Sequence, residues 1–229
     1  MNPSDPNLLM IEAAVRSLGT LCDHVVFVGG STTGLLITEE ARPQSRATQD
    51  VDVIIELASL PDYYELEQEL RNRGFSPDTK VICRWHIDHL IFDVIPTRDI
   101  GLGFENRWYP LAAQRAKQHS LPSGAVIRVV TPPFFISTKL EAFYDRGNGD
   151  YGASHDMEDI ITVVDGRVEL IDEIETADAD VRTDIKEEFD YLLATPEFVD
   201  SLSWHLLGDA ASQARLPELI RRLRTIAGI

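Results

Sequence analysis

The sequence of 229 residues lacks the features that mark membrane, secreted and zinc-binding proteins. No apolar run approaches the roughly 20 residues that a membrane-spanning helix needs. The first residues, Met1–Pro6, contain neither a basic nor an apolar segment, so we expect no signal peptide. The two cysteines, Cys22 and Cys83, are too few for a disulfide framework, and no Cys/His cluster has the spacing of zinc ligands. We therefore expect a cytoplasmic protein with buried free thiols and no membrane partner.

Positive charge is also scarce in this sequence. Lysine and arginine number 21 against 38 aspartates and glutamates, which gives a formal net charge of −17. Because contacts of Lys and Arg with phosphate drive binding to nucleic acid, this balance argues against protein-wide attraction to it, and we expect no sequence-specific DNA binding. The overall charge does not exclude a local basic groove. Residues 169–190 hold much of the acid, but apolar residues interleave there, which predicts solvated helix faces.

The order of apolar segments predicts an α+β fold. Apolar residues make up 44% of the chain, enough for a substantial core, and there are no internal repeats or low-complexity linkers. Strand patterns occupy residues 1–130 and helix patterns occupy residues 131–229. We expect a core with a mixed, α/β-like sheet in the first segment and a helical C-terminal region in the second.

Hydrophobic periodicity, cap residues and glycine stops give the expected elements. A polar loop is expected over 39–49, and residues 97–124 are expected to be irregular apart from one helix. The expected helices are 7–18, 31–38, 60–74, 110–118, 132–146 and 155–164, and the remainder, 168–228, is expected to be helical. The expected strands are 24–28, 51–56, 80–86, 88–95 and 126–130, with the third and fourth forming a hairpin around Asp88.

Two aspartates open the strand expected at 51–56. Alternation of side chains along a strand places Asp50 and Asp52 on the same face. Two neighbouring carboxylates repel each other and lose hydration if they are buried. A divalent cation would remove both penalties, and Mg²⁺ takes oxygen ligands from one or two carboxylates together with substrate phosphates. The alternative is a pair of strand-edge carboxylates that face water.

A third strand carboxylate, Asp93, lies within the apolar segment 90–95. A lone aspartate there is costly to bury unless it is paired, hydrogen-bonded or metal-bound. Three strand carboxylates and a glycine turn fit two-metal catalysis, in which two cations clamp the attacking and leaving oxygens of an in-line displacement. The alternative for Asp93 is an exposed position on an edge strand.

A glycine turn, Gly29-Gly30-Ser31, follows the strand expected at 24–28. Glycines let the backbone turn tightly and approach a ligand closely, and the start of the next helix would direct amides at an anion. Ser31 and Thr32 would add hydroxyl donors. The segment is neither a P-loop, because the Gly-Lys-Ser/Thr ending is missing, nor a dinucleotide fingerprint. An ordinary strand-to-helix turn is the alternative.

Together these motifs resemble the polymerase β-like nucleotidyltransferase superfamily. The order is Gly-Gly-Ser at 29–31, Arg-x-Thr-x-Asp-x-Asp at 46–52, and a later strand aspartate at Asp93. The Arg-x-Thr form is similar to the AbiEii branch, which includes type IV toxin components. Residues 137–146 and 155–160 resemble two helices of that branch, so the resemblance extends over about 25–165.

The resemblance implies a nucleotidyltransferase-fold core whose cleft is completed by the helical region. It implies transfer of a nucleoside monophosphate from a nucleoside triphosphate to an acceptor hydroxyl, with release of pyrophosphate and with Mg²⁺ or Mn²⁺ as cofactor. An RNA such as tRNA, or a protein, would be the acceptor, and a toxin-like role would bring an antitoxin partner. A small-molecule acceptor remains open.

The resemblance also implies roles for individual residues. Asp50, Asp52 and Asp93 would bind the metal ions, and Asp93 would also act as the base on the acceptor hydroxyl. The residues that would hold the nucleotide are Gly29, Gly30, Ser31, Arg46, Thr48, Lys139 and Asp156, with Lys139 on the phosphates and Asp156 as its acidic counterpart.

Each of these roles has a simpler alternative. Arg46 and Thr48 could instead brace the loop, Lys139 could be a solvated lysine, and Asp156 could favour the first turn of its helix. For the whole chain, the alternative is a non-catalytic module that binds a nucleotide or a partner and keeps the fold.

Overall fold

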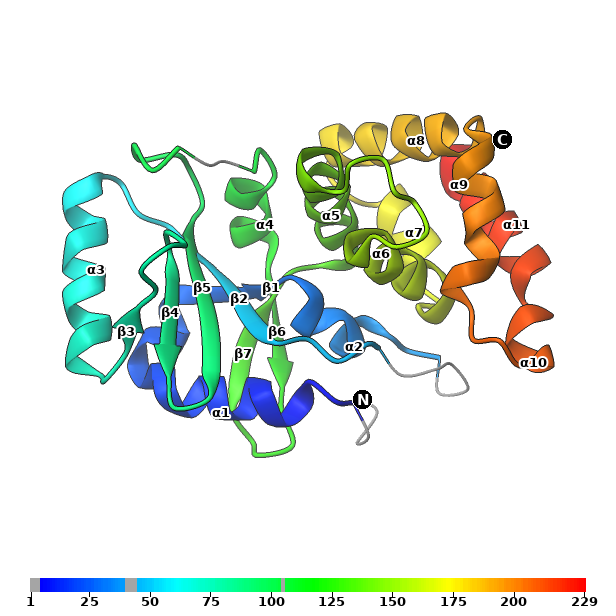
Figure 1. Ribbon diagram of the computed structural model, residues 1–229. Helices are drawn as coiled ribbons and strands as arrows, with labels where there is room; N and C mark the ends of the chain where they lie inside the picture. The colour runs from blue at the N-terminus through cyan, green and yellow to red at the C-terminus, as the bar shows by residue number, and fades with distance from the viewer. Residues whose placement is uncertain (1–4, 40–44, 104–105) are drawn as a thin grey trace. The chain divides into compact units, whose positions relative to one another are not determined.

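The structure is a computed structural model that describes residues 5–39, 45–103 and 106–229 (Figure 1). It has a mixed α+β fold with a helical C-terminal region, as expected from the sequence. The chain divides into two compact units. The described residues of the sheet unit are 5–34, 46–103 and 106–131, and those of the helical unit are 35–39, 45 and 132–229.

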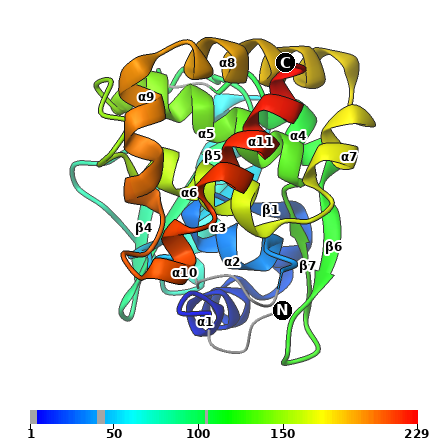
Figure 2. The same ribbon diagram turned by 90° about the vertical axis from the view of Figure 1, so that its right-hand side faces the viewer.

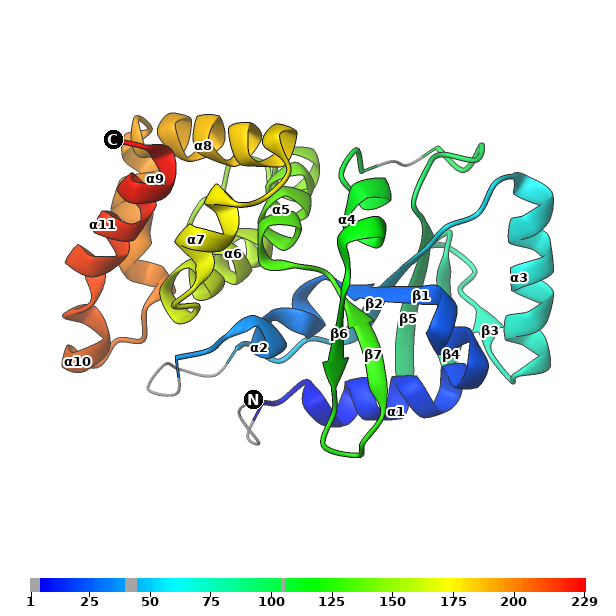
Figure 3. The same ribbon diagram turned by 180° about the vertical axis from the view of Figure 1, so that it is seen from behind.

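Seven strands of the described chain form one mixed sheet in the order β3-β4-β5-β2-β1-β7-β6. At its centre, β1 pairs antiparallel with β2 and parallel with β7, and β2 pairs parallel with β5. The outer pairs are antiparallel, and β6 and β7 form a hairpin that is visible in Figure 3. The strands are β1 Val25–Val28, β2 Asp50–Ile55, β3 Ser76–Pro77, β4 Arg84–Ile87, β5 Leu90–Pro96, β6 Lys117–Ser120 and β7 Val126–Val129.

Helix α3 of the sheet unit buries one apolar stripe. The stripe of α3 consists of Tyr63, Leu66 and Leu70, and Ser59 caps this helix by accepting a hydrogen bond from the N–H of Asp62 at 3.5 Å. The helical segments are α1 Leu8–Leu18, η1 Gly19–His24, η2 Gly30–Thr32, α3 Leu60–Asn72 and α4 Tyr109–Arg115, and α2 Thr33–Leu36 lies where the chain passes to the helical unit.

The helical unit is built around α5, α6, α8 and α11, which pack against one another (Figure 2). In α8 the buried residues Val181, Ile185, Phe189 and Leu192 lie on one stripe and the carboxylates lie outside it, which confirms the expected solvated helix face. The elements are α5 Pro132–Arg146, α6 His155–Gly166, α7 Leu170–Glu175, α8 Ala179–Leu193, α9 Pro196–Ser201, η3 Leu202–His205, α10 Ala210–Gln213 and α11 Leu216–Ala227.

Three expectations about secondary structure need correction. The first hairpin strand begins at Arg84 and not at residue 80, because Asp78 holds the preceding turn by accepting hydrogen bonds from the N–H groups of Lys80 and Val81. The expected helix 110–118 ends at Arg115, and residues 117–120 form β6 instead. Strands β3 and β6 were not expected, since both are short, exposed edge strands without apolar alternation. Of the expected loop 39–49, residues 40–44 lie outside the described chain, as do 104 and 105 of the expected irregular segment.

The two cysteines agree with expectation. Cys22 and Cys83 are both free and buried. Burial raises the pKa of each thiol to about 11, which keeps the sulfurs protonated near neutral pH. Within the described part of the chain, no helix combines the length and the hydropathy required to cross a membrane.

One buried amide ties the start of α1 to the segment that leads into β2. The Asn7 Nδ2 group donates to the carbonyl of Arg46 at 2.9 Å, and Asn7 Oδ1 accepts from the N–H of Thr48 at 2.9 Å. The Thr48 hydroxyl in turn donates to the carbonyl of Asp50 at 3.1 Å. The backbone that carries the first strand aspartates is therefore held from outside the sheet.

Replacement of Asn7 tests this brace. Asn7→Ala leaves a half-buried carbonyl and a half-buried N–H without this partner, so we expect the free energy of unfolding to fall by about 1–3 kcal/mol. Urea unfolding followed by circular dichroism measures the change. Asn72→Ala is the control, because its amide oxygen accepts an exposed hydrogen bond from Gln68 at 3.1 Å, and it should cost no more than about 0.5 kcal/mol. Equal effects of the two substitutions would contradict the brace.

Candidate metal and phosphate site

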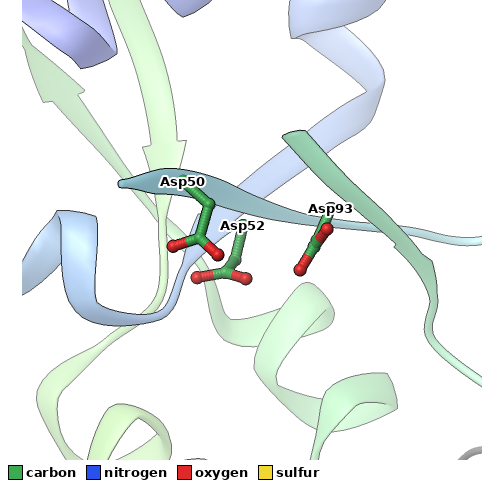
Figure 4. A group of neighbouring side chains, drawn as sticks. All are labelled: Asp50, Asp52 and Asp93. Carbon is green, nitrogen blue, oxygen red and sulfur yellow. The ribbon is translucent and has the colours of Figure 1, made fainter. Parts of the chain in front are cut away.

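Three aspartates meet on two adjacent parallel strands of the sheet unit (Figure 4). Asp50 and Asp52 belong to β2 and Asp93 belongs to β5, with Asp52 directly beside Asp93 in the register. Each offers one carboxylate oxygen, and these oxygens all lie within 4.8 Å of one another. The side chains are half-buried, so an ion from solvent could reach them. We call Asp50, Asp52 and Asp93 the aspartate triad.

An arginine that the sequence analysis did not single out pairs with this triad. Arg84 on β4 lies directly opposite Asp93 in the antiparallel register. Its Nε donates to Asp93 Oδ1 at 2.8 Å and its Nη2 donates to Asp93 Oδ2 at 2.8 Å, which is a two-pronged contact. Nη2 also donates to Asp50 Oδ2 at 3.1 Å. The hairpin expected around Asp88 could have revealed Arg84, because folding that hairpin back on itself places Arg84 across from Asp93.

The charges of this group favour a divalent cation. The hydrogen bonds and charge of Asp93, with the charges of Asp50 and Asp52, outweigh burial and raise the pKa of Arg84 above its usual value. Three carboxylates gather here, and Arg84 pairs with two of them, Asp50 and Asp93. Carboxylate oxygens are the ligands that Mg²⁺ and Mn²⁺ prefer. The donor set of the aspartate triad therefore fits such an ion.

Gly29 brings the glycine turn against Asp52. Its φ of 71° lies in the region that side-chain-bearing residues rarely adopt. A Cβ atom at this position would stand 2.0 Å from Asp52 Oδ2, so only glycine leaves room for that carboxylate. The turn and the aspartate triad are thus parts of one arrangement.

The other residues of the turn differ in what they can offer to an anion. The Thr32 hydroxyl already donates to the carbonyl of Gly29 at 2.8 Å, so it is not the additional donor that we expected. Ser31 is fully buried, and its hydroxyl has no hydrogen-bond partner within the described residues. The helical segments that follow, η2 from Gly30 and then α2, have three and four residues, too short for the expected helix dipole to matter. The Ser31 hydroxyl and local amides remain as candidate donors.

Thr48 and Arg46 lie in the brace described above. The N–H and the hydroxyl of Thr48 both donate to Asn7 Oδ1, and the hydroxyl also donates to the carbonyl of Asp50. The Arg46 carbonyl accepts from Asn7 Nδ2. For Thr48 the structure thus shows the bracing role that the sequence analysis kept as an alternative. Contact of either residue with a nucleotide stays a prediction.

Lys139 and Asp156 form a second ion cluster, in the helical unit. The Lys139 Nζ lies 2.9 Å from Asp156 Oδ1 and 2.7 Å from Asp159 Oδ2. Arg146 donates to both oxygens of Asp156, at 2.8 and 2.9 Å. We call Lys139, Arg146, Asp156 and Asp159 the helical ion cluster. Lys139 is buried, so the alternative of a solvated lysine is wrong. Asp156 lies in the first turn of α6, as expected, and Ser154 caps this helix by accepting from the N–H of Met157.

The charges of the helical ion cluster balance internally. Burial lowers the pKa of Lys139, but Asp159 and Asp156 outweigh this and raise it above its usual value. Burial raises the pKa of Asp156, but Arg146 and Lys139 outweigh this and lower it from 3.8 to about 2. The pairing of Lys139 with its acidic counterpart is therefore observed. Its contact with a phosphate stays a prediction, and the aspartate triad belongs to the other unit.

Comparison with known proteins adds little to this geometry. No protein-family model matches the chain, and no curated protein matches it. A solved structure with similarity is that of JHP933 from Helicobacter pylori, with 13% sequence identity and a TM-score of 0.45 over 96% of this chain and 92% of that chain.

Removal of the buried ammonium group tests the helical ion cluster. Lys139→Met leaves two buried carboxylates without their shared counter-charge, so we expect the free energy of unfolding to fall by about 3–5 kcal/mol. The matched control is Lys186→Met, because Lys186 is only half-buried and pairs with the exposed Glu175 at 2.8 Å. It should cost about 0–1 kcal/mol. Urea unfolding measures both. Similar small losses for the two variants would contradict the assignment of Lys139 as a buried counter-charge.

The lowered pKa of Asp156 predicts a defined acid sensitivity. Its contribution to stability is complete above the usual pKa of 3.8 and is lost as the pH falls toward about 2. Asp156→Asn should be less stable than the natural protein at pH 7, and its stability should fall about 2 kcal/mol less between pH 4 and pH 2. Unfolding measured along a pH series checks this, and parallel curves for the two proteins would refute it.

Proposed function

We propose that the protein is a metal-dependent nucleotidyltransferase that moves a nucleoside monophosphate from a nucleoside triphosphate to an acceptor hydroxyl. One observation carries the proposal. The aspartate triad gathers three carboxylate oxygens within 4.8 Å of one another, and Gly29 turns directly against Asp52. A cation site and a glycine turn at the same strand ends are what binding of a metal-complexed triphosphate requires.

The proposed division of labour follows from the positions of these side chains. Asp50, Asp52 and Asp93 would hold Mg²⁺ or Mn²⁺, which neutralises charge on the attacking and leaving oxygens of the reaction. The turn from Gly29 to Ser31 would hold the triphosphate through the Ser31 hydroxyl and backbone amides. Asp93 would take the proton of the acceptor hydroxyl while the oxygen of that hydroxyl forms a bond to the α-phosphorus. The bond from that phosphorus to the β-phosphate oxygen breaks, and pyrophosphate leaves.

The charge of the chain bears on the acceptor. The formal net charge of −17 weakens the case for tRNA, whose binding needs many Lys and Arg contacts. Lys139 and Arg146 are paired in the helical ion cluster, which removes two cations from any basic groove. We therefore favour a hydroxyl on a protein over one on RNA. A toxin-like role with an antitoxin partner belongs to the same proposal.

Arg84 favours a second candidate function, a non-catalytic module that binds a nucleotide or a partner. The guanidinium group already contacts Asp93 and Asp50, so part of the triad's charge is neutralised without any metal. A cluster balanced in this way could serve structure alone. The two candidates differ in whether the protein forms a covalent product.

Labelling with a nucleotide distinguishes the two candidates. The protein is incubated with α-labelled nucleoside triphosphates, Mg²⁺ and either total RNA or total cell protein, and label in macromolecules is measured. Asp52→Asn keeps the shape of the side chain but removes its charge, so we expect label to fall about hundredfold or more. Asp23→Asn, which changes an exposed carboxylate of the same unit, should label like the natural protein. Nucleotide binding without label in either acceptor, or equal label with Asp52→Asn, would refute the transferase.

A further inference from the structure

A single row of charged side chains crosses three neighbouring strands of the sheet unit. Arg84 on β4 is opposite Asp93 on β5, and Asp93 is beside Asp52 on β2. Asp50 lies two residues before Asp52 on the same face of β2. Like charges side by side in a sheet repel, so a cation beside this row stabilises it. Arg84 is a cation that the fold itself supplies there.

The three hydrogen bonds from Arg84 are not equivalent. The two bonds to Asp93 are both 2.8 Å and form a planar two-pronged contact. The bond to Asp50 is 3.1 Å, and Asp50 is also the more exposed acid, with 33% of its side chain accessible against 17% for Asp93. The contact with Asp50 is therefore the one that an incoming ion would break first.

The backbone beneath Arg84 is held firmly. Cys83 has a positive φ of 64°, and its carbonyl accepts from the N–H of Val94 at 2.8 Å. Trp85, the next residue, is buried and pairs with Phe92 across the hairpin. A shift of the Arg84 charge must therefore come from rotation of its side chain and not from movement of the strand.

We propose that Arg84 is a resident cation of the aspartate triad, which a divalent ion displaces from Asp50 on binding while the contact with Asp93 persists. The proposal rests on the metal site of the proposed function and adds a residue that sets its affinity. In the metal-free protein Arg84 reduces repulsion among the three carboxylates. For the same reason it opposes the entry of a second positive charge.

Metal titration of Arg84 variants tests the proposal. Arg84→Gln should bind Mn²⁺ about tenfold more tightly than the natural protein in isothermal titration calorimetry, because a competing positive charge is gone. In EDTA it should unfold at a temperature about 4 °C lower, because the triad is then less neutralised. At saturating Mn²⁺ this difference should shrink or reverse. Arg84→Lys keeps the charge without the two-pronged contact and should have an intermediate affinity, which provides a second test if Arg84→Gln folds poorly.

The matched control is Arg221→Gln. Arg221 makes the same two-pronged contact with Glu218, at 2.8 and 2.6 Å, in an exposed position on α11 of the other unit, and its loss should not change Mn²⁺ affinity. Weaker or unchanged Mn²⁺ binding by Arg84→Gln would overturn the proposal even if the natural protein transfers nucleotides. Tighter binding without nucleotide transfer would support it and refute the proposed function. Absence of Mn²⁺ binding in every protein would overturn both.

Discussion

Repulsion among three carboxylates is the constraint around which the candidate site is organised. The parallel register of β2 and β5 places Asp52 beside Asp93, and alternation along β2 adds Asp50 to the same face. Like charges this close are tolerated only with a counter-charge, with solvent, or with both. Two neighbouring features make this arrangement possible. Gly29 leaves room for the Asp52 carboxylate, and Arg84 on β4 supplies a positive charge.

The two ion clusters of the protein differ in the balance of their charges. In the helical ion cluster two basic and two acidic groups pair with one another, and Lys139 and Asp159 are almost completely buried. Such a cluster is costly to disturb but has no charge left for a ligand. The aspartate triad gathers three carboxylates in a half-buried place that solvent can reach, and Arg84 pairs with two of them. It is therefore the better candidate for chemistry, whereas the helical ion cluster holds helices together.

The proposed role of Arg84 would give the triad two states with different cations. The guanidinium contacts Asp50 and Asp93 without metal, and with a divalent ion the same carboxylates would become ligands of a reactive site. The proposed transferase corresponds to a protein whose triad binds a divalent ion. The non-catalytic alternative corresponds to a protein whose triad stays paired with Arg84 alone. Metal affinity and covalent product therefore have to be measured separately.

The sequence alone determined the α+β class, most helices, and the shared face of Asp50 and Asp52, because local periodicity and alternation specify these features. The sequence did not predict edge strands such as β6, because main-chain pairing with β7 and not an apolar pattern holds that strand in place. The resemblance predicted that Asp93 joins the pair and that Asp156 accompanies Lys139, and the tertiary structure places these residues together. Only the tertiary structure showed that Arg84 pairs with Asp50 and Asp93 and that Lys139 is buried. Each of these depends on register or helix packing between segments distant in the chain, and side-chain type alone does not specify which partners meet.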